Sequence, residues 1–375
     1  MILRINKELY KIIVLCISYV LLLLGSVSGF YSIKYYGLSL LLLLILKDFK
    51  EKPLKKEEAI IFVLVFVVGI ISIPFQNITI GQSVSSLAYY LVLFLISVRG
   101  YSVFTSYKQI RAVTIIISVI AIVVLLFSRS ELLYQYTTLR QFTGRLRLYG
   151  LFNHVNTFAY LCALIMISYD VVRGRKHILS NSILIIIFGV FLLLTDSRGA
   201  MAFAGFYFGL NIYIKLLEKY NFSYRNKFLI TCVLMGVASF IFFKYVLVYV
   251  FSQATYANRM AVFKEISGSI SEIVFGRGMV DASSVDYSNV TGYIEIAWLN
   301  IFYKGGILSV LIYVLIFINI WNRKHFKSVE RQFKVFYFAV LLTMLVEAVV
   351  TSIFNFAPLF LWPLLSSLST NEFNC

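Results

Sequence analysis

Apolar runs about as long as a bilayer is thick recur along most of this sequence, and they constrain its fold more than any other feature. Runs of about 17–25 apolar residues match the roughly 30 Å hydrocarbon core when they form α-helices. Backbone groups in lipid must be hydrogen-bonded within the protein, which limits spanning segments to helices and closed barrels. Barrel strands alternate apolar and polar residues, and these runs do not. The sequence therefore predicts an all-α, polytopic membrane helical bundle.

The composition supports this prediction and argues against a soluble domain. The chain is 60% hydrophobic and 14% charged, with a mean hydropathy of +0.87. Soluble domains carry about 25% charged residues. No internal repeat or low-complexity tract divides the sequence, so residues 1–375 are expected to form a single integral membrane domain.

About 11 membrane spans are predicted from the apolar runs, and a twelfth segment stays open. Residues 354–368 contain Pro358 and Pro363, so they form either a twelfth helix or a broken one. The first run follows basic residues as in a signal peptide, but it lacks a small-residue cleavage site and is expected to stay as an anchor. The predicted spans are 9–29, 32–46, 59–75, 84–98, 112–127, 151–172, 182–195, 199–217, 228–251, 293–321 and 335–350.

Lysines and arginines predict the orientation. If the N-terminus is cytoplasmic, the inner segments hold about 23 of the 34 Lys and Arg residues, as the positive-inside rule requires. Two longer loops then lie outside, a main extracytoplasmic loop at 252–292 and a second one at 128–150. This pattern is typical of a multi-pass membrane protein. The net charge of +17 is attributed to inner ends that face anionic membrane lipid, and nucleic acid binding is not expected.

Arginines on the predicted outer face are exceptions to this charge pattern. Arginine grips phosphate through a rigid two-pronged fork, whereas lysine presents a point charge. The cluster therefore suggests an anionic, lipid-linked ligand, although some members alternatively snorkel or pair with nearby Asp and Glu. The outer arginines are Arg129, Arg140, Arg145, Arg147, Arg198, Arg259 and Arg277.

Two of these arginines precede a polar segment that enters a helix at its outer end. Arg145 and Arg147 are followed by Asn153, His154 and Asn156. A helix start presents unpaired N–H groups and partial positive charge, so an anion is favoured there. Capping or hydrogen bonding explains His154 at least as well as catalysis does.

Arg198 and Arg259 occur in two further informative contexts. Arg198 follows Thr195-Asp196-Ser197 in a turn between two apolar runs, a turn short enough that we expect it to be buried among the helices. Charge at membrane depth indicates a functional site. Arg259 begins an amphipathic piece of the 252–292 loop.

Four segments in this order resemble the bacterial O-antigen ligase and Wzy-type polysaccharide polymerase superfamily. Gly150-Leu-Phe-Asn-His-Val-Asn156-Thr-Phe-Ala resembles its G-x-F-x-(H)-x-N-x-F-A helix entry. Thr195-Asp196-Ser197-Arg198-Gly199 is similar to its T-x-S-R-G turn. Arg259 corresponds to the arginine that opens its main outer loop, and Phe275-Gly276-Arg277-Gly278 to the f-G-x-G segment that closes it.

The sequence departs from the family pattern at the next motif. The family has a histidine–asparagine pair about ten residues before G-x-x-G. Here Glu295 and Ile296 occupy those positions, Gly306 keeps the first glycine and Ser309 replaces the second. By resemblance, Glu295 would replace the histidine that activates the acceptor, with Asp286 as a second candidate. This difference favours the polymerase branch over the ligase branch.

The resemblance implies a multi-pass GT-C-like glycosyltransferase of the bacterial plasma (inner) membrane. Such an enzyme joins polyprenyl-pyrophosphate-linked oligosaccharide repeat units into a surface glycan, such as O-antigen, capsule or exopolysaccharide. Arg198 and Arg259 would stabilise the leaving pyrophosphate, with Glu295 as the base. No cofactor and no metal is expected, because pyrophosphate is already an activated leaving group. A chain-length regulator and a flippase of the same pathway are possible partners. Ligase-type transfer to another acceptor, or a lipid-linked oligosaccharide flippase or transporter, are the alternatives.

Overall fold

The computed structural model confirms the all-helical prediction for the residues that it describes. The described residues are 2–27, 29–71, 80–127, 148, 151–152, 155–172, 178–219, 270–277, 297–323, 327–345 and 355–370. Within these ranges the secondary structure is helical and contains no strand, and an isolated antiparallel bridge pairs Val27 with Phe152.

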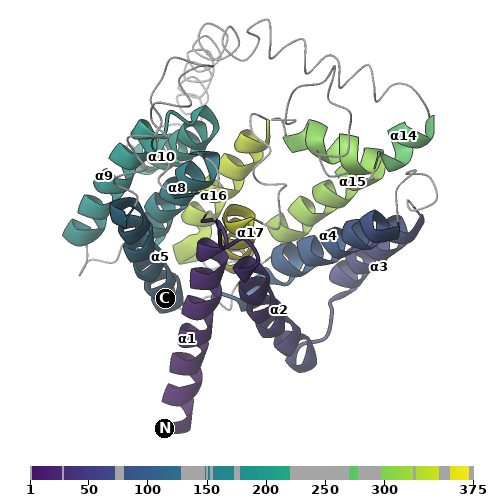
Figure 1. Ribbon diagram of the computed structural model, residues 1–375, viewed down its shortest axis with the longest axis horizontal. Helices are drawn as coiled ribbons and strands as arrows, with labels where there is room; N and C mark the ends of the chain where they lie inside the picture. The colour runs from purple at the N-terminus through teal and green to yellow at the C-terminus, as the bar shows by residue number, and fades with distance from the viewer. Residues whose placement is uncertain are drawn as a thin grey trace, which may run out of the picture.

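In the described residues, each predicted span other than 228–251 overlaps a helix (Figure 1). The 228–251 prediction lies outside the described residues. The helices are α1 (Ile2–Leu24), α2 (Ile33–Glu51), α3 (Lys56–Ile71), α4 (Ile80–Val98), the 3-10 turn η2 (Gly100–Ser102), α5 (Tyr107–Phe127), α8 (Val155–Val171), α9 (Ile178–Leu194), α10 (Arg198–Lys219), α14 (Ile270–Phe275), α15 (Ala297–Trp321), α16 (Lys327–Met344) and α17 (Phe356–Leu368).

The start of α16 differs from the prediction for a physical reason. The helix begins at Lys327, whereas the apolar run predicted a start at residue 335. Its first turns are polar and include an ion pair between Lys334 and Glu330, four residues apart. Such pairs stabilise a helix outside an apolar environment, so hydropathy alone does not mark where the helix begins.

Three of the described helices, α5, α10 and α15, are long and apolar enough to cross a membrane. The apolar helices α8, α9 and α17 are shorter. Together these helices indicate a helical membrane protein.

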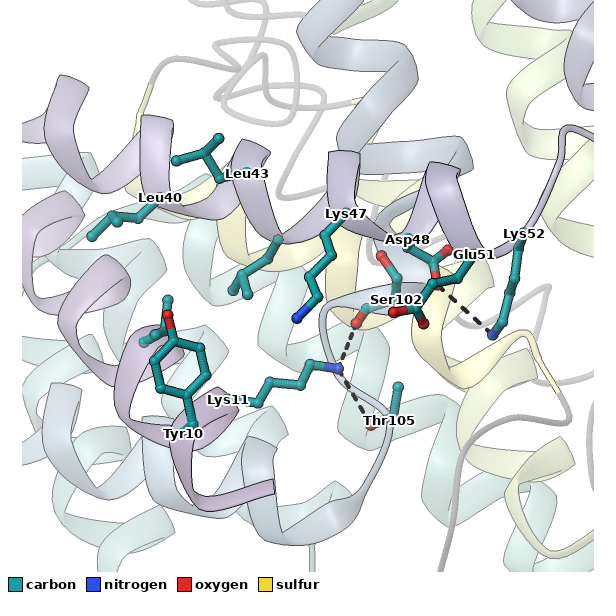
Figure 2. Close-up of a pocket in the computed structure, with 12 residues that line it drawn as sticks. Tyr10, Lys11, Leu40, Leu43, Lys47, Asp48, Glu51, Lys52, Ser102 and Thr105 are labelled. Carbon is teal, nitrogen blue, oxygen red and sulfur yellow. Dashed lines mark hydrogen bonds and ion pairs between the residues drawn. The ribbon is translucent and has the colours of Figure 1, made fainter. Parts of the chain in front are cut away.

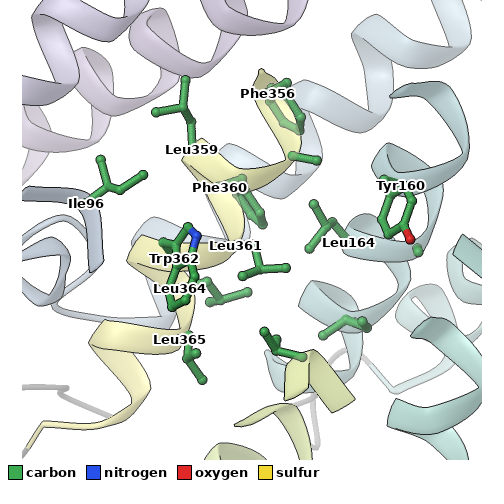
Figure 3. Packing of buried hydrophobic residues seen from close by; sticks show 14 of the residues in the cluster. Ile96, Tyr160, Leu164, Phe356, Leu359, Phe360, Leu361, Trp362, Leu364 and Leu365 are labelled. Atoms are coloured by element: carbon green, nitrogen blue, oxygen red, sulfur yellow. The ribbon is translucent and has the colours of Figure 1, made fainter. Parts of the chain in front are cut away.

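Helix α17 lies at the centre of the bundle (Figure 1) and contacts α1, α4, η2, α8 and α16. All of its 13 residues are buried, and Figure 3 shows Leu359, Phe360 and Trp362 among core side chains that include Ile96 and Leu164. A helix of 13 residues is only about 20 Å long. Of the segment left open by the sequence, residues 356–368 form one continuous, enclosed helix.

Pro363 lies inside α17, and the structure shows how the helix accommodates it. Proline has no N–H, so it leaves the carbonyl four residues earlier without its helical partner. That carbonyl belongs to Leu359, and the Tyr19 hydroxyl of α1 donates a hydrogen bond to it over 3.1 Å. Tyr19 is fully buried and also packs against the rings of Phe356 and Phe360. One side chain therefore completes the hydrogen bonding of the central helix.

Tyr19→Phe is expected to destabilise the protein by about 1–3 kcal/mol, because it leaves the Leu359 carbonyl buried and unsatisfied. The matched control is Tyr337→Phe, which removes a similar hydrogen bond to the Phe317 carbonyl at 3.0 Å. In a regular helix that carbonyl keeps its N–H partner, so the control should cost no more than about 1 kcal/mol. Thermal unfolding of both variants in detergent measures the difference, and equal losses would contradict this role of Tyr19.

The two ends of the bundle differ chemically. At one end, called the basic end, Lys11 of α1 donates to the Ser102 carbonyl over 2.6 Å, and Arg323, just after α15, contacts Glu58 of α3. At the other end, called the motif end, α1 leads to the bridge between Val27 and Phe152, and Tyr303 near the start of α15 contacts Arg277.

Candidate functional site

The motif end joins two segments that the sequence singled out separately. The Leu148 amide donates to the Leu194 carbonyl over 2.9 Å, and the Ser197 hydroxyl donates to Asn156 Oδ1 over 2.9 Å. Ser197 belongs to the turn between α9 and α10, and Asn156 lies in the first turn of α8. Although 41 residues separate them, the polar helix entry and the arginine-containing turn form one structural unit.

The turn between α9 and α10 is buried at Thr195 and Ser197, as predicted, half-buried at Asp196 and exposed at Arg198. Thr195 and Ser197 are 0% and 2% exposed. The Thr195 hydroxyl donates to the Leu192 carbonyl over 2.7 Å and accepts from the Ser197 amide at 3.3 Å. Asp196 has φ of 49°, in the left-handed region that Asp tolerates better than most residues.

The Arg198 side chain is exposed, which corrects the prediction that it is buried with the turn. Arg198 is the first residue of α10, so its backbone continues the turn while its side chain is accessible to solvent. The buried Thr195 and Ser197 therefore fix the position from which the guanidinium projects. An exposed guanidinium on a rigid base is accessible to a ligand that approaches this end.

A second unit at the motif end is formed by glycines that the sequence placed in separate motifs. Helix α15 is interrupted at Gly305 and Gly306, and Gly306 has φ of 62°. Gly276, directly after α14, has φ of 69° and packs its backbone on this interruption. A Cβ at Gly306 would overlap the Val274 carbonyl, so the close approach requires glycine. The closing segment of the 252–292 loop is thereby docked on α15.

Arg277 is held by protein partners. Its guanidinium forms an ion pair with Glu272 at 3.3 Å and lies 5.7 Å from the ring centroid of Tyr303. Its backbone amide donates to the Tyr303 carbonyl over 2.9 Å. The sequence left two interpretations of the outer arginines, ligand binding or pairing with nearby Asp and Glu. For Arg277 the contacts favour pairing.

Two of the predicted site residues, Arg198 and Asn156, belong to the described ranges, and both lie at the motif end. The other predicted site residues lie outside the described ranges. These are Arg145, Arg147, Asn153, His154, Arg259, Asp286 and Glu295.

Sequence reasoning missed a cluster of buried hydroxyl groups below the α15 interruption. Tyr90 and Ser309 are hydrogen-bonded to each other, and the Tyr89 and Tyr313 hydroxyls are 2.6 Å apart. A Cβ at Gly305 would overlap the Tyr90 hydroxyl. Ser309, noted in the sequence only as a departure from G-x-x-G, instead joins α15 to α4. In the sequence, Ser309 follows Gly305 by four residues, about one helical turn. This spacing was the one sign that the two residues could contact the same partner.

Within the described ranges, no group of three or more His, Cys, Asp or Glu side chains is placed to hold a metal ion. Comparison of the chain with models of known protein families and with curated proteins finds no match.

Proposed function

We propose that this chain is a glycosyltransferase, a polymerase that joins polyprenyl-pyrophosphate-linked oligosaccharide repeat units at the outer face of a bacterial plasma membrane. The observation that carries the proposal is the hydrogen bond between Ser197 and Asn156. It joins two of the segments that resemble the polymerase superfamily into one unit, at the end of the bundle from which Arg198 projects.

A second observation supports the same location. The docking of Gly276 on Gly305 and Gly306 anchors the 252–292 loop, at a point within it, to the interruption in α15. Both Arg259 and Glu295 flank this anchor in the sequence. A loop anchored at a point within it has less conformational freedom to lose when a ligand binds, which suits a loop that carries substrate contacts.

The proposed reaction needs a base at the acceptor and positive charge at the leaving group. The acceptor hydroxyl oxygen attacks the anomeric carbon of the donor glycan and forms the new glycosidic bond. The bond from that carbon to the pyrophosphate oxygen breaks, and polyprenyl pyrophosphate leaves with the electron pair. Glu295 takes the proton of the hydroxyl, and Arg198 and Arg259 stabilise the charge that develops on the pyrophosphate.

The remaining site residues are assigned to binding. Arg145, Arg147 and His154 would contact the pyrophosphate or glycan next to Asn153 and Asn156, where the start of α8 adds N–H donors that favour an anion. Asp286 is proposed to bind sugar hydroxyls and is the second candidate base. In this scheme the arginines supply the charge that a divalent metal provides in other phosphate-transferring sites.

The direct test is a reaction with purified protein and polyprenyl pyrophosphate oligosaccharide, analysed for glycan length. A ladder of longer lipid-linked products is expected. Transfer to a different acceptor without a ladder would indicate ligase activity instead. Movement of donor across a vesicle membrane without any new bond would indicate a flippase, and either result contradicts the polymerase proposal.

Glu295→Gln is expected to leave donor binding intact and to lower turnover by roughly 10²–10⁴-fold, because the amide cannot accept the proton. Asp286→Asn serves as the comparison, since it removes a carboxylate from the second candidate. Donor binding is measured with a fluorescent polyprenyl pyrophosphate analogue, and turnover by the ladder assay. Normal turnover in Glu295→Gln, with loss in Asp286→Asn, would reassign the base to Asp286.

A further inference from the structure

The basic end contains a cavity between α1 and α2 (Figure 2), at the opposite end of α1 from the Val27–Phe152 bridge. Its volume is about 400 Å³, which is within the usual range for a small-molecule site. None of the proposed site residues lines it.

The lining of the cavity changes from apolar to charged along α2. Leu40, Leu43 and Leu44 form the apolar region, and the charged region begins a helical turn later with Lys47 and Asp48. These positions recur at helical spacing and share one face of the helix. Leu43 is 61% exposed, so the apolar region opens to the surroundings of the bundle. Such a lining matches a molecule with a hydrocarbon portion and a charged head.

The charged region of the cavity has three lysines, Lys11, Lys47 and Lys52, against two carboxylates, Asp48 and Glu51, so positive charge is in excess by one. Asp48 is neutralised by Arg99 at 3.0 Å and by Lys52 at 3.8 Å. Lys11 is held with its ammonium group at the Ser102 carbonyl, and Figure 2 shows the Lys47 ammonium group directed toward that of Lys11. Lys47 has no hydrogen bond or ion pair with the described residues of the chain. Two ammonium groups therefore converge where a head group would lie.

We propose that this cavity is a binding site for an anionic phospholipid, whose phosphate lies between Lys11 and Lys47 and whose acyl chain lies along the leucines of α2. The charge selects an anionic head group, and the open apolar region selects a lipid over a free phosphate ion. Each lysine near a membrane surface adds a roughly equal contribution to the affinity for an anionic lipid. The site is independent of the glycosyltransferase proposal, because it uses none of the same residues.

The test measures retained lipids on the full-length protein in detergent by native mass spectrometry. Phosphatidylglycerol and phosphatidylcholine with identical acyl chains are supplied in equal amounts, and inorganic phosphate is supplied separately. The wild type is expected to retain phosphatidylglycerol with about tenfold preference and to bind no inorganic phosphate at the same concentration. Lys47→Ala should lower this preference about fivefold, and Lys47→Glu should abolish it.

Lys108→Ala is the matched control, because Lys108 is an exposed lysine at the start of α5 that does not line the cavity. Lys47 is also exposed, so its variants should fold, and unchanged thermal unfolding checks this. Equal retention of the two lipids by the wild type would overturn the proposal. An equal loss in Lys47→Ala and Lys108→Ala, or binding of inorganic phosphate as tight as that of the lipid, would also overturn it.

Discussion

Glu58→Ala is expected to lower the free energy of unfolding by about 3–5 kcal/mol, the range measured when one partner of a buried ion pair is removed. The Glu58 carboxylate contacts Arg99 at 3.1 Å and Arg323 at 3.7 Å. The three side chains are 1–8% exposed. Without the carboxylate, two guanidinium groups stay buried with less compensating charge, and that desolvation cost is the source of the expected loss.

Further contacts fix these guanidinium groups in place, so they cannot relax toward solvent. Arg99 also contacts Asp48 and donates to the Lys52 carbonyl over 2.9 Å. Arg323 donates to the Ser366 hydroxyl of α17 over 2.7 Å. Removal of Glu58 should therefore loosen α3, α4 and the central helix together.

The Tyr101 ring lies against both arginines, 5.2 Å from Arg99 and 5.1 Å from Arg323. Burial raises the pKa of the Tyr101 hydroxyl, and the charge of Glu58 raises it further. The hydroxyl is therefore neutral at physiological pH, and the ring contributes to the cluster through its electron-rich face.

The matched control for Glu58 is Glu218→Ala, because Glu218 pairs with Arg331 at 3.0 Å while its side chain is 55% exposed. Exposed pairs contribute about 0–1 kcal/mol. Thermal or denaturant unfolding of both variants in the same detergent measures the difference. A Glu58→Ala loss no larger than that of Glu218→Ala would show that the buried cluster does not hold the helices together.

Arg198→Ala and Arg259→Ala are each expected to reduce chain extension by at least roughly 10²–10³-fold, the usual loss when one donor to a developing anion is removed. Lysine should restore only some of the activity, because a point charge cannot reproduce the two-pronged contact of a guanidinium. The ladder assay measures the loss, with expression and membrane insertion checked for each variant. Because the Arg198 side chain is exposed, its removal should leave thermal stability nearly unchanged.

Arg277→Ala is the control for these variants. Arg277 lies at the same end but is paired with Glu272, so it should be needed for local packing rather than for the pyrophosphate. Its variant should keep chain extension within a few-fold of the wild type, a change of less than about 1.4 kcal/mol. Wild-type polymer from both Arg198→Ala and Arg259→Ala would reject the proposed role of the arginines.

Hydropathy predicted the helices well because lipid imposes one solution on long apolar runs. Hydropathy did not predict helix boundaries or continuity where ion pairs or hydrogen bonds determine them. The polar start of α16 depends on ion pairs, and the continuity of α17 across Pro363 depends on Tyr19, which is 340 residues away from Leu359 in the sequence. A contact between residues so far apart in the sequence leaves no pattern in either local segment from which it could be predicted.

Charge was the least predictable feature. Basic residues of the inner segments were expected to face lipid head groups, but Arg99 is 0% exposed and belongs to a buried cluster. Arg198, expected to be buried, is exposed. Sequence position shows how near a charge is to a helix end, but the partners from other helices decide whether it is buried. The pairing of Ser197 with Asn156 was likewise visible only in three dimensions.

The most direct test of the central claim is photocrosslinking with a polyprenyl pyrophosphate that carries a photoreactive group next to its phosphates, followed by mapping of the labelled peptides. The proposed function predicts labelling of peptides around Arg198 and Asn156, and its loss in Arg198→Ala. Labelling confined to the cavity between Lys11 and Lys47, or labelling that Arg198→Ala leaves unchanged, would contradict it.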